Sequence, residues 1–226
     1  MKQGIRWGLY TLGMLVLALG LTLNTKTGLG VSPIISVAFG VSEIWGLNFG
    51  DLTFLLYGLF VAGQIALRRG RGWLTDLLQL PLSLVFSRVL NVYSAVIPYR
   101  CEAHSLWENL LLLAAAILLT GIGAAVTVNM RLVPNPGDGI VAAVAERLGR
   151  DQGFGKNLVD VCCVALTCVI GLTAEGRVVG VGLGTVAAMV CVGRVIALVN
   201  RLGRDWMCAA AGLVPAGRGD APAAPG

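Results

Sequence analysis

The sequence predicts an all-α membrane protein: a polytopic helix bundle of about six transmembrane helices and two short broken or re-entrant helices, forming an inverted-topology repeat. Hydrophobic residues make up 56% of the 226 positions and charged residues 13%, whereas soluble domains have about 45–50% and about 25%. The long apolar stretches are apolar on every side, while barrel strands alternate over about 10 residues. Because backbone groups in hydrocarbon must be satisfied internally, we expect helices.

Six stretches are long enough to cross a bilayer, which needs roughly 20 apolar residues. They lie at about 5–25, 50–67, 73–97, 106–128, 155–174 and 177–200. Two shorter stretches, 33–46 and 137–149, each follow a loop rich in glycine and proline. At 1.5 Å per residue they reach only about 20 Å. We therefore expect them to enter the membrane without crossing it.

The positive residues predict how the helices are oriented. If neither short helix crosses, twelve of the 17 Lys and Arg residues fall on the side of the N-terminus, and two lie within spans. The other side holds only Lys26, Arg100 and Arg177. Since cytoplasmic loops carry the excess of Lys and Arg, we expect both termini to be cytoplasmic.

The two halves of the chain resemble each other. A shift of 105 positions aligns three polar pairs: Thr22 with Thr127, Asn24 with Asn129, and Lys26 with Arg131. We therefore expect a first three-span repeat at 1–100, a second at 101–203, and a disordered cytoplasmic tail at 204–226. Since three crossings are an odd number, the second repeat enters from the opposite side, as in many secondary transporters.

Two arginines inside predicted spans are candidates for binding a solute. A cation in hydrocarbon costs at least about 2.5–3.5 kcal/mol, so it normally faces a cavity or a partner. Arg88 is expected to bind an anion or, alternatively, to pair with a carboxylate such as Asp76 or Asp160. Arg194 is expected at the same site unless its side chain reaches the membrane surface. Asp160 is also a candidate for coupling to a proton or another cation.

The two loops rich in glycine and proline supply further candidates. Ser32 and Asp138 are expected as N-caps of the short helices, whose first turns would direct unpaired N–H groups and partial positive charge into the protein. Such groups suit a carboxylate or a phosphate. Lys26 and Arg131 flank the loops at equivalent positions. The alternative is a pair of capped loops with interfacial cations.

Two features concern helix shape. Gln79 is a candidate binding residue because Pro81 should kink its span and free a carbonyl beside it. In the last span, a ladder of small residues should let helix backbones approach closely. Its members are Gly176, Gly180, Gly184 and Ala188.

Motifs of soluble enzymes are absent from the sequence. It has no Walker loop, GxSxG, HExxH or CxxC motif, so we expect no enzyme activity, no cofactor and no metal. The net charge of +5 does not indicate nucleic acid, because the positive residues lie at the ends of spans. Expected partners are the lipid bilayer and a small-molecule solute. The sequence does not decide whether the protein forms a homo-oligomer.

One set of motifs is similar to that of a known family. Arg6 lies near the start of the chain, and the first span contains Gly13 and Gly20. The loop at 26–33, the turn at 46–50 and the segment at 134–139 read KTGLGVSP, GLNFG and PNPGDG. With these motifs, residues 5–200 resemble the YczE/YyaS/YitT family of bacterial membrane proteins. The resemblance implies a protein of the bacterial inner membrane and allows a transporter, without naming a substrate.

These patterns lead us to expect a membrane permease or exporter of a small organic solute, with a bias toward anionic or zwitterionic compounds. It would work by alternating access around a site near Arg88, Arg194 and the starts of the short helices. Two other classes stay open. One is a vitamin-binding membrane subunit of an energy-coupling importer, which would co-purify with an ATPase. The other is a non-transporting membrane scaffold or regulator, which would hold a stable partner.

Overall fold

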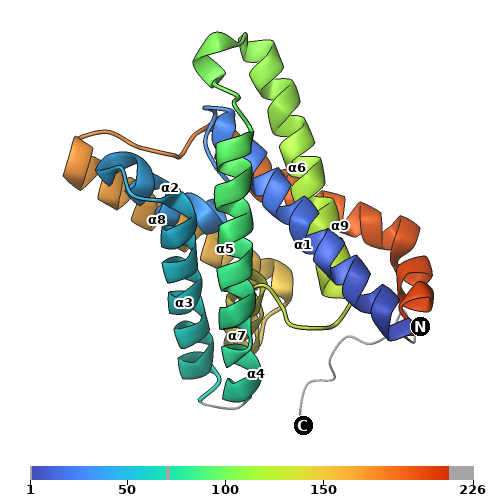
Figure 1. The fold of residues 1–226 in the computed structure, drawn as a ribbon. Coiled ribbons are helices and arrows are strands. Elements are labelled where there is room, and N and C mark those ends of the chain that lie inside the picture. Colours follow the sequence, from blue (N-terminus) through green and yellow to red (C-terminus); the bar gives the residue numbers. More distant parts are fainter. Residues whose placement is uncertain (1, 70–71, 214–226) are drawn as a thin grey trace.

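The fold is a bundle of helices, described by a computed structural model for residues 2–69 and 72–213 (Figure 1). Six segments are helical, long and apolar enough to cross a membrane. They are α1 (Lys2–Lys26), α3 (Phe49–Leu67), α4 (Trp73–Leu77) together with α5 (Gln79–Val96), α6 (Leu106–Asn129), α8 (Gln152–Glu175) and α9 (Leu183–Ala210). The short helices are α2 (Pro33–Trp45) and α7 (Pro136–Leu148), and a 3₁₀ turn covers Cys101–Ala103. The predicted polytopic helix bundle is confirmed.

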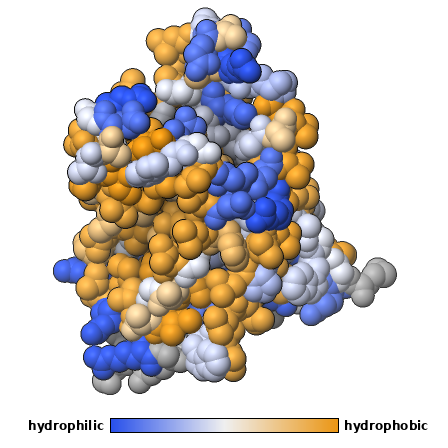
Figure 2. Space-filling model, turned by 60° about the vertical axis from the view of Figure 1, so that its left-hand side comes forward, coloured by the Kyte–Doolittle hydropathy of each residue, from blue (hydrophilic) through white to orange (hydrophobic). Residues whose placement is uncertain are grey.

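Hydrophobic side chains cover the outside of the bundle. Figure 2 shows them over most of the middle of one side, while hydrophilic side chains gather near the two ends and in one further patch. Large exposed examples are Leu55 on α3, Val96 on α5 and Leu183 on α9. Soluble monomers rarely expose so much contiguous apolar area. The chain is therefore a multi-pass membrane protein.

The crossing of α1 and α6 forms the most extensive helix contact in the described residues (Figure 1). Glycines let the two backbones meet there. A Cβ on Gly20 would clash with the backbone nitrogen of Thr120, and a Cβ on Gly123 would clash with that of Leu17. Small residues at such positions are typical of helix pairs in membranes, where packing rather than the hydrophobic effect holds helices together.

The two short helices have the same length and similar ends. Each has 13 residues, begins at a proline and is followed by a glycine in the left-handed region, Gly46 (φ 63°) or Gly149 (φ 62°). Proline at the first helical position and glycine after the last are favourable start and stop residues. Both α2 and α7 pack against α3 and α8. Their first turns meet inside the bundle, where a Cβ on Gly137 would lie 3.0 Å from Ile34 Cγ1.

The start of α1 and the end of α9 lie on one face of the bundle, which we call the N-terminal face (Figure 1). Tyr10 and Met207 share a hydrophobic cluster there with Met130. We call the other end, where α1 finishes, the opposite face. Because this packing extends α9 to Ala210, the expected disordered tail is wrong for residues 204–210. The tail from 214 onward lies outside the described residues.

The last span begins later than expected. Gly176 (φ 67°) ends α8, and an extended segment at 177–182 leads to α9. The Gly180 carbonyl in this segment accepts a hydrogen bond of 2.9 Å from the backbone N–H of Val31. The predicted ladder of small residues is therefore wrong for its first two members, which lie outside a helix. Gly184 and the fourth member are in α9.

The third span is interrupted at one residue, Leu78, whose backbone keeps right-handed helical angles (φ −62°, ψ −17°). α4 ends at Leu77, α5 begins at Gln79, and Leu78 lies between them. Pro81 explains the break, because its ring excludes a helical carbonyl four residues earlier and it has no N–H to donate. Gln79, the first residue of α5, is fully buried.

Candidate functional site

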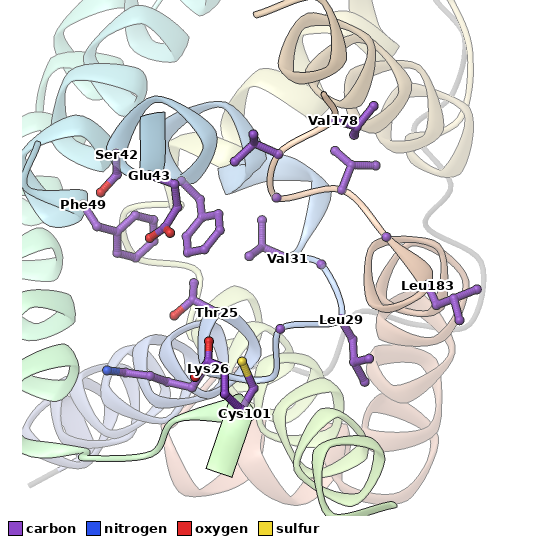
Figure 3. Close-up of a pocket in the computed structure, with 18 of the residues that line it drawn as sticks. Thr25, Lys26, Leu29, Val31, Ser42, Glu43, Phe49, Cys101, Val178 and Leu183 are labelled. Atoms are coloured by element: carbon purple, nitrogen blue, oxygen red, sulfur yellow. The ribbon is translucent and has the colours of Figure 1, made fainter. Parts of the chain in front are cut away.

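A cavity of about 870 Å³ opens on the opposite face, and we call it the vestibule (Figure 3). It lies among the end of α1 with the loop that follows, the α2–α3 corner, the segment between α5 and α6, and the extended segment before α9. Its volume falls in the range of about 300–1,000 Å³ typical of small-molecule sites. Polar uncharged side chains that line it are Thr25, Ser42, Ser94 and Tyr99.

Positive charge is concentrated in the vestibule. Its lining contains Lys26, Arg100 and Arg177, the three cations that the sequence assigns to the side with few positive residues. Two carboxylates, Glu43 and Glu102, also line it. The vestibule therefore presents three cations and two anions to whatever enters it.

One hydrogen bond and one ion pair position two of these cations. Lys26 occupies the last turn of α1 and is half-buried, and its Nζ donates to the Ser94 carbonyl oxygen at 3.1 Å. Arg177 is exposed, with its Nε 3.6 Å from Glu175 Oε2. Since Lys26 bonds a neutral carbonyl, its charge is uncompensated by that contact and can attract an anion.

Two loops that are distant in sequence form one wall of the vestibule. The backbone N–H of Gly184 donates to the Leu29 carbonyl at 2.7 Å, next to the Val31–Gly180 bond. Gly30 adopts a φ of 101°, and a Cβ there would lie 2.5 Å from the Gly182 nitrogen. Glycine is required at this position both for its backbone conformation and for the close approach.

The segment between α5 and α6 forms another wall and is held to α6. The Tyr99 hydroxyl donates to Asn109 Oδ1 at 2.8 Å, and Asn109 Nδ2 donates to the Cys101 carbonyl at 3.1 Å. The rings of Tyr99 and His104 stack with centroids 4.2 Å apart. These contacts fix the Cys101 thiol at the edge of the vestibule (Figure 3).

On the N-terminal face, ion pairs join α3, α4 and α7. Arg68, just after α3, places Nη1 2.8 Å from Asp76 Oδ1 and Nε 3.2 Å from Glu146 Oε2. Asp76 is buried, with 2% of its side chain exposed, whereas Glu146 is exposed. One guanidinium thus ties the α3–α4 corner to the end of α7.

A buried amide pair lies deeper on the same side. Gln64 Nε2 donates to Gln79 Oε1 at 3.1 Å, and Gln79 Nε2 donates back to Gln64 Oε1 at 2.8 Å. Both side chains are fully buried. Gln64 Nε2 also lies 3.3 Å from the carbonyl of Pro136, the first residue of α7. The pair therefore joins α3, α5 and the start of α7.

The structure brings some of the predicted site residues to polar interior positions. Lys26 lines the vestibule, and Gln79 belongs to the amide pair. Asp160 is fully buried in α8, where its Oδ2 accepts a hydrogen bond of 2.7 Å from Lys156 Nζ. These three residues lie in separate clusters rather than in one site.

The expected site near Arg88 and Arg194 is not formed. Both side chains are exposed on the outside of the bundle. Arg88 Nη2 lies 2.7 Å from Asp51 Oδ1, so its partner is neither Asp76 nor Asp160. Gln79, Ser83 and Ser87 recur every four residues on the buried side of α5, and Arg88 lies outside this stripe. Its depth within the predicted span therefore did not show which side it faces.

The predicted caps also need correction. Ser32 occupies the N-cap position of α2, but its side chain makes no capping hydrogen bond. α7 is capped by Asn135, whose Oδ1 accepts from the Gly137 N–H at 2.9 Å, so Asp138 is an exposed first-turn residue instead of the cap. Arg131 is exposed on the N-terminal face, away from the vestibule. The helix begins earlier than expected because proline starts it at Pro136.

Several residues at these clusters were not among the sequence candidates. Arg100 and Arg177 could have been identified because few Lys and Arg residues were predicted on the opposite face. Gln64 could have been found as an amide within an apolar span, since polar residues at membrane depth normally have a partner. No sequence signal pairs it with Gln79, because that contact depends on how α3 and α5 pack.

Comparisons with known proteins identify relatives over most of the chain. The profile described as "Family of unknown function (DUF6198)" matches residues 4–201. YyaS of Bacillus subtilis (strain 168), named an uncharacterized protein, is 25% identical over 184 residues, covering 81% of this chain and 86% of YyaS. YczE of the same organism, named an uncharacterized membrane protein, is 23% identical over 199 residues, covering 87% and 86%. No solved structure matches. The predicted resemblance to the YczE/YyaS group is confirmed.

Proposed function

We propose that this chain, which belongs to the DUF6198 family, is a permease or exporter of a small organic solute. The description of that family assigns no activity. The vestibule carries the proposal, because it combines a ligand-sized volume with three cations on a protein that crosses the membrane several times.

The charges favour an anionic or zwitterionic solute. Lys26, Arg100 and Arg177 suit a carboxylate or phosphate, since charge-assisted hydrogen bonds are roughly twice as strong as neutral ones. Glu43 and Glu102 offer acceptors for an ammonium group on the same solute. A neutral apolar solute would leave these charged groups without compensation.

Alternating access is supported by the difference between the two faces. The vestibule is open on the opposite face, while Arg68 and the Gln64–Gln79 pair join helices on the N-terminal face. The matched lengths and ends of α2 and α7, and their packing on the same two helices, support an inverted repeat of 1–100 and 101–203. Such repeats rock against each other in many secondary transporters.

The proposed setting is the bacterial inner membrane, with both termini in the cytoplasm and the vestibule facing outward. The membrane-protein name of YczE and the excess of Lys and Arg on the N-terminal side support this orientation. With no nucleotide-binding motif in the sequence, the solute gradient or an ion gradient would supply the energy. Lipid and the solute are the proposed partners.

The first prediction concerns solute binding. Purified full-length protein is heated with small dicarboxylates, zwitterionic amino acids or inorganic phosphate, and at least one class should raise the melting temperature. Lys26→Gln and Arg177→Gln should each weaken the apparent affinity by about ten- to 150-fold, because a hydrogen bond to a charged group contributes about 1.5–3 kcal/mol. Thermal shift against ligand concentration measures the affinity.

Arg194→Gln is the matched control, since it removes one cation from the outside of the bundle. It should bind the stabilising solute as the wild type does. An equal loss of affinity in the control would contradict a site in the vestibule. The absence of both stabilisation and proteoliposome uptake across the three classes would contradict the proposed function, and an ATPase retained through purification would favour a vitamin-binding importer subunit.

A further inference from the structure

Outside the vestibule, the carboxylate of Asp160 has an environment that structural needs alone do not explain. Its side chain is 0% exposed within α8. Oδ2 accepts from Lys156 Nζ at 2.7 Å, but Oδ1 has no hydrogen-bond partner among the residues that the structure describes. Burying a carboxylate with an unsatisfied oxygen is unfavourable, and such residues at membrane depth commonly serve proton or ion pathways.

Asp160 belongs to a stripe along one side of α8. Lys156, Asp160, Cys163 and Thr167 follow one another at intervals of four, three and four residues, which places them on one helix face. Lys156, with 32% of its side chain exposed, lies in the second turn of α8 near the N-terminal face. Thr167 lies about 10 Å beyond Asp160 along the axis, at 1.5 Å per residue. The stripe therefore leads from the N-terminal face into the bundle.

The far end of this stripe reaches the wall of the vestibule. Thr167 Oγ1 lies 2.8 Å from Ser36 Oγ on α2. A Cβ on Gly40, one turn further along α2, would lie 3.0 Å from the Thr167 methyl group and 3.6 Å from the Val179 carbonyl. Val179 lines the vestibule. A buried carboxylate, a hydroxyl pair and the vestibule thus follow each other across the bundle.

The surroundings of Asp160 fit a proton better than a metal ion. An ammonium group already occupies one carboxylate oxygen and would repel a second cation. The flanking residues Val159 and Cys163 pack in a hydrophobic cluster with Ile140 of α7. Within 2–69 and 72–213, no group of three or more His, Cys, Asp or Glu side chains could hold a metal ion.

Few charged groups belong to the helices packed against α8. On α7 they are Asp138, Glu146 and Arg147, and on α2 there is Glu43, which lines the vestibule. Glu146 pairs with Arg68. Asp138 interacts electrostatically with both Lys156 and Asp160. Lys156 is therefore the cation in direct contact with Asp160, and Asp138 is the carboxylate on α7 that interacts with both.

We propose that Asp160 binds the proton that couples ion movement to opening and closing of the vestibule, an inference that rests on the proposed transport function. A proton that reaches Asp160 converts the carboxylate to a carboxylic acid, and only an O–H bond forms. The ion pair then separates, and the Lys156 ammonium turns toward the N-terminal face. Loss of the proton restores the pair. The form with an ionised Asp160 carboxylate accompanies the open vestibule, so protonation favours the closed form.

Cys101 at the edge of the vestibule reports the opening. Full-length wild type and Asp160→Asn in detergent are labelled with a maleimide below and above neutral pH, and peptide mass spectrometry gives the rate at Cys101. Dividing by the rate for the SDS-unfolded chain at the same pH removes the effect of thiol ionisation. The normalised wild-type rate should fall several-fold at the lower pH, whereas Asp160→Asn should show the low rate at both.

A second variant keeps the test informative if Asp160→Asn fails to fold. Lys156→Met removes the cation that favours the carboxylate, so the midpoint of the pH dependence should move upward. Asp205→Asn, an exposed carboxylate on α9, is the matched control and should behave as wild type. Replacing sodium with potassium should change nothing.

A wild-type rate that does not vary with pH would overturn the inference. So would an unaltered pH dependence in Asp160→Asn or an unmoved midpoint in Lys156→Met, and a requirement for sodium would overturn the assignment to a proton. If any of these results were found and a solute still stabilised the wild type, the proposed transport function would be retained without proton coupling through Asp160. If no solute stabilised the wild type but Cys101 labelling still depended on pH as expected, the proposed transport function would be contradicted and proton binding by Asp160 would not.

Discussion

Buried polar side chains differ in whether they have a partner. Gln64 and Gln79 satisfy each other, and Asn129 Nδ2 donates to Asn200 Oδ1 at 2.7 Å. Asn24 aligns with Asn129 in the shifted sequence, yet neither polar atom of its side-chain amide has a partner in the described part of the chain. Buried polar groups are nearly always hydrogen-bonded. The Gln64–Gln79 and Asn129–Asn200 pairs therefore join helices, whereas the side-chain amide of Asn24 makes no hydrogen bond to another helix in the described part of the chain.

The amide pair supports a prediction about stability. Gln79→Leu removes one amide and leaves the buried amide of Gln64 without its main partner, which should cost about 1–3 kcal/mol. Replacing both residues by leucine removes the unsatisfied group as well, so the double variant should recover much of the loss. Equilibrium unfolding in mixed micelles measures the free energy of each variant. A double variant as unstable as the sum of the two singles would contradict coupling between the amides.

Helix ends and helix crossings are determined by small residues and prolines. Pro33 and Pro136 start the short helices, and glycines follow their ends, so local sequence already defines these elements. The crossing of α1 and α6 depends instead on close approach of two backbones that meet at Gly20 and Gly123. Because the contact is with backbone atoms, a larger side chain at either glycine would force the two helix axes apart.

Gly123→Ala should destabilise the bundle by about 1–3 kcal/mol, the usual range for an overpacked interior. The new Cβ would meet the Leu17 backbone, which cannot move aside as the end of a flexible side chain can. Gly58→Ala is the matched control, because a Cβ there has nothing within 4 Å. Apparent melting temperatures of the purified variants provide the comparison. Equal melting temperatures would show that the α1–α6 crossing tolerates separation.

At the scale of the whole molecule, the two faces of the bundle have different roles. The vestibule with its three cations opens on the opposite face, and the ion pairs of Arg68 lie on the N-terminal face. The stripe on α8 connects the two. This polarity requires that Cys101 and the start of α8 lie on different sides of the membrane.

Labelling of intact cells tests that requirement. A membrane-impermeant maleimide should label Cys101 in the wild type, because the vestibule is proposed to face outward. In a Cys101→Ser background, Gln152→Cys should react only after permeabilisation, since Gln152 is an exposed residue in the first turn of α8 on the N-terminal face. Mass spectrometry of the labelled peptides gives both results. Labelling of both positions from the same side would exclude the proposed topology.

The number, length and limits of most helices were predictable from the sequence. Apolar stretches of sufficient length must be helical in hydrocarbon, and prolines and glycines start and stop them locally. Lys26 could be recognised as a candidate because it flanks the first loop rich in glycine and proline, at a position equivalent to Arg131. The exceptions, the start of α9 and its extension beyond residue 203, arise from contacts with the loop before α2 and with the start of α1.

Only the tertiary structure decided which polar side chains face one another. Arg88 faces outward and pairs with Asp51, while Gln64 faces inward and pairs with Gln79. The buried side of α5 carries Gln79, Ser83 and Ser87, whereas Leu84, Val85 and Val92 are exposed. A polar stripe therefore marks the interior, but no pattern in the sequence names the partner of Arg88 or of Gln64. The vestibule likewise exists because segments distant in the chain meet at the opposite face, through helix packing and through hydrogen bonds between two loops.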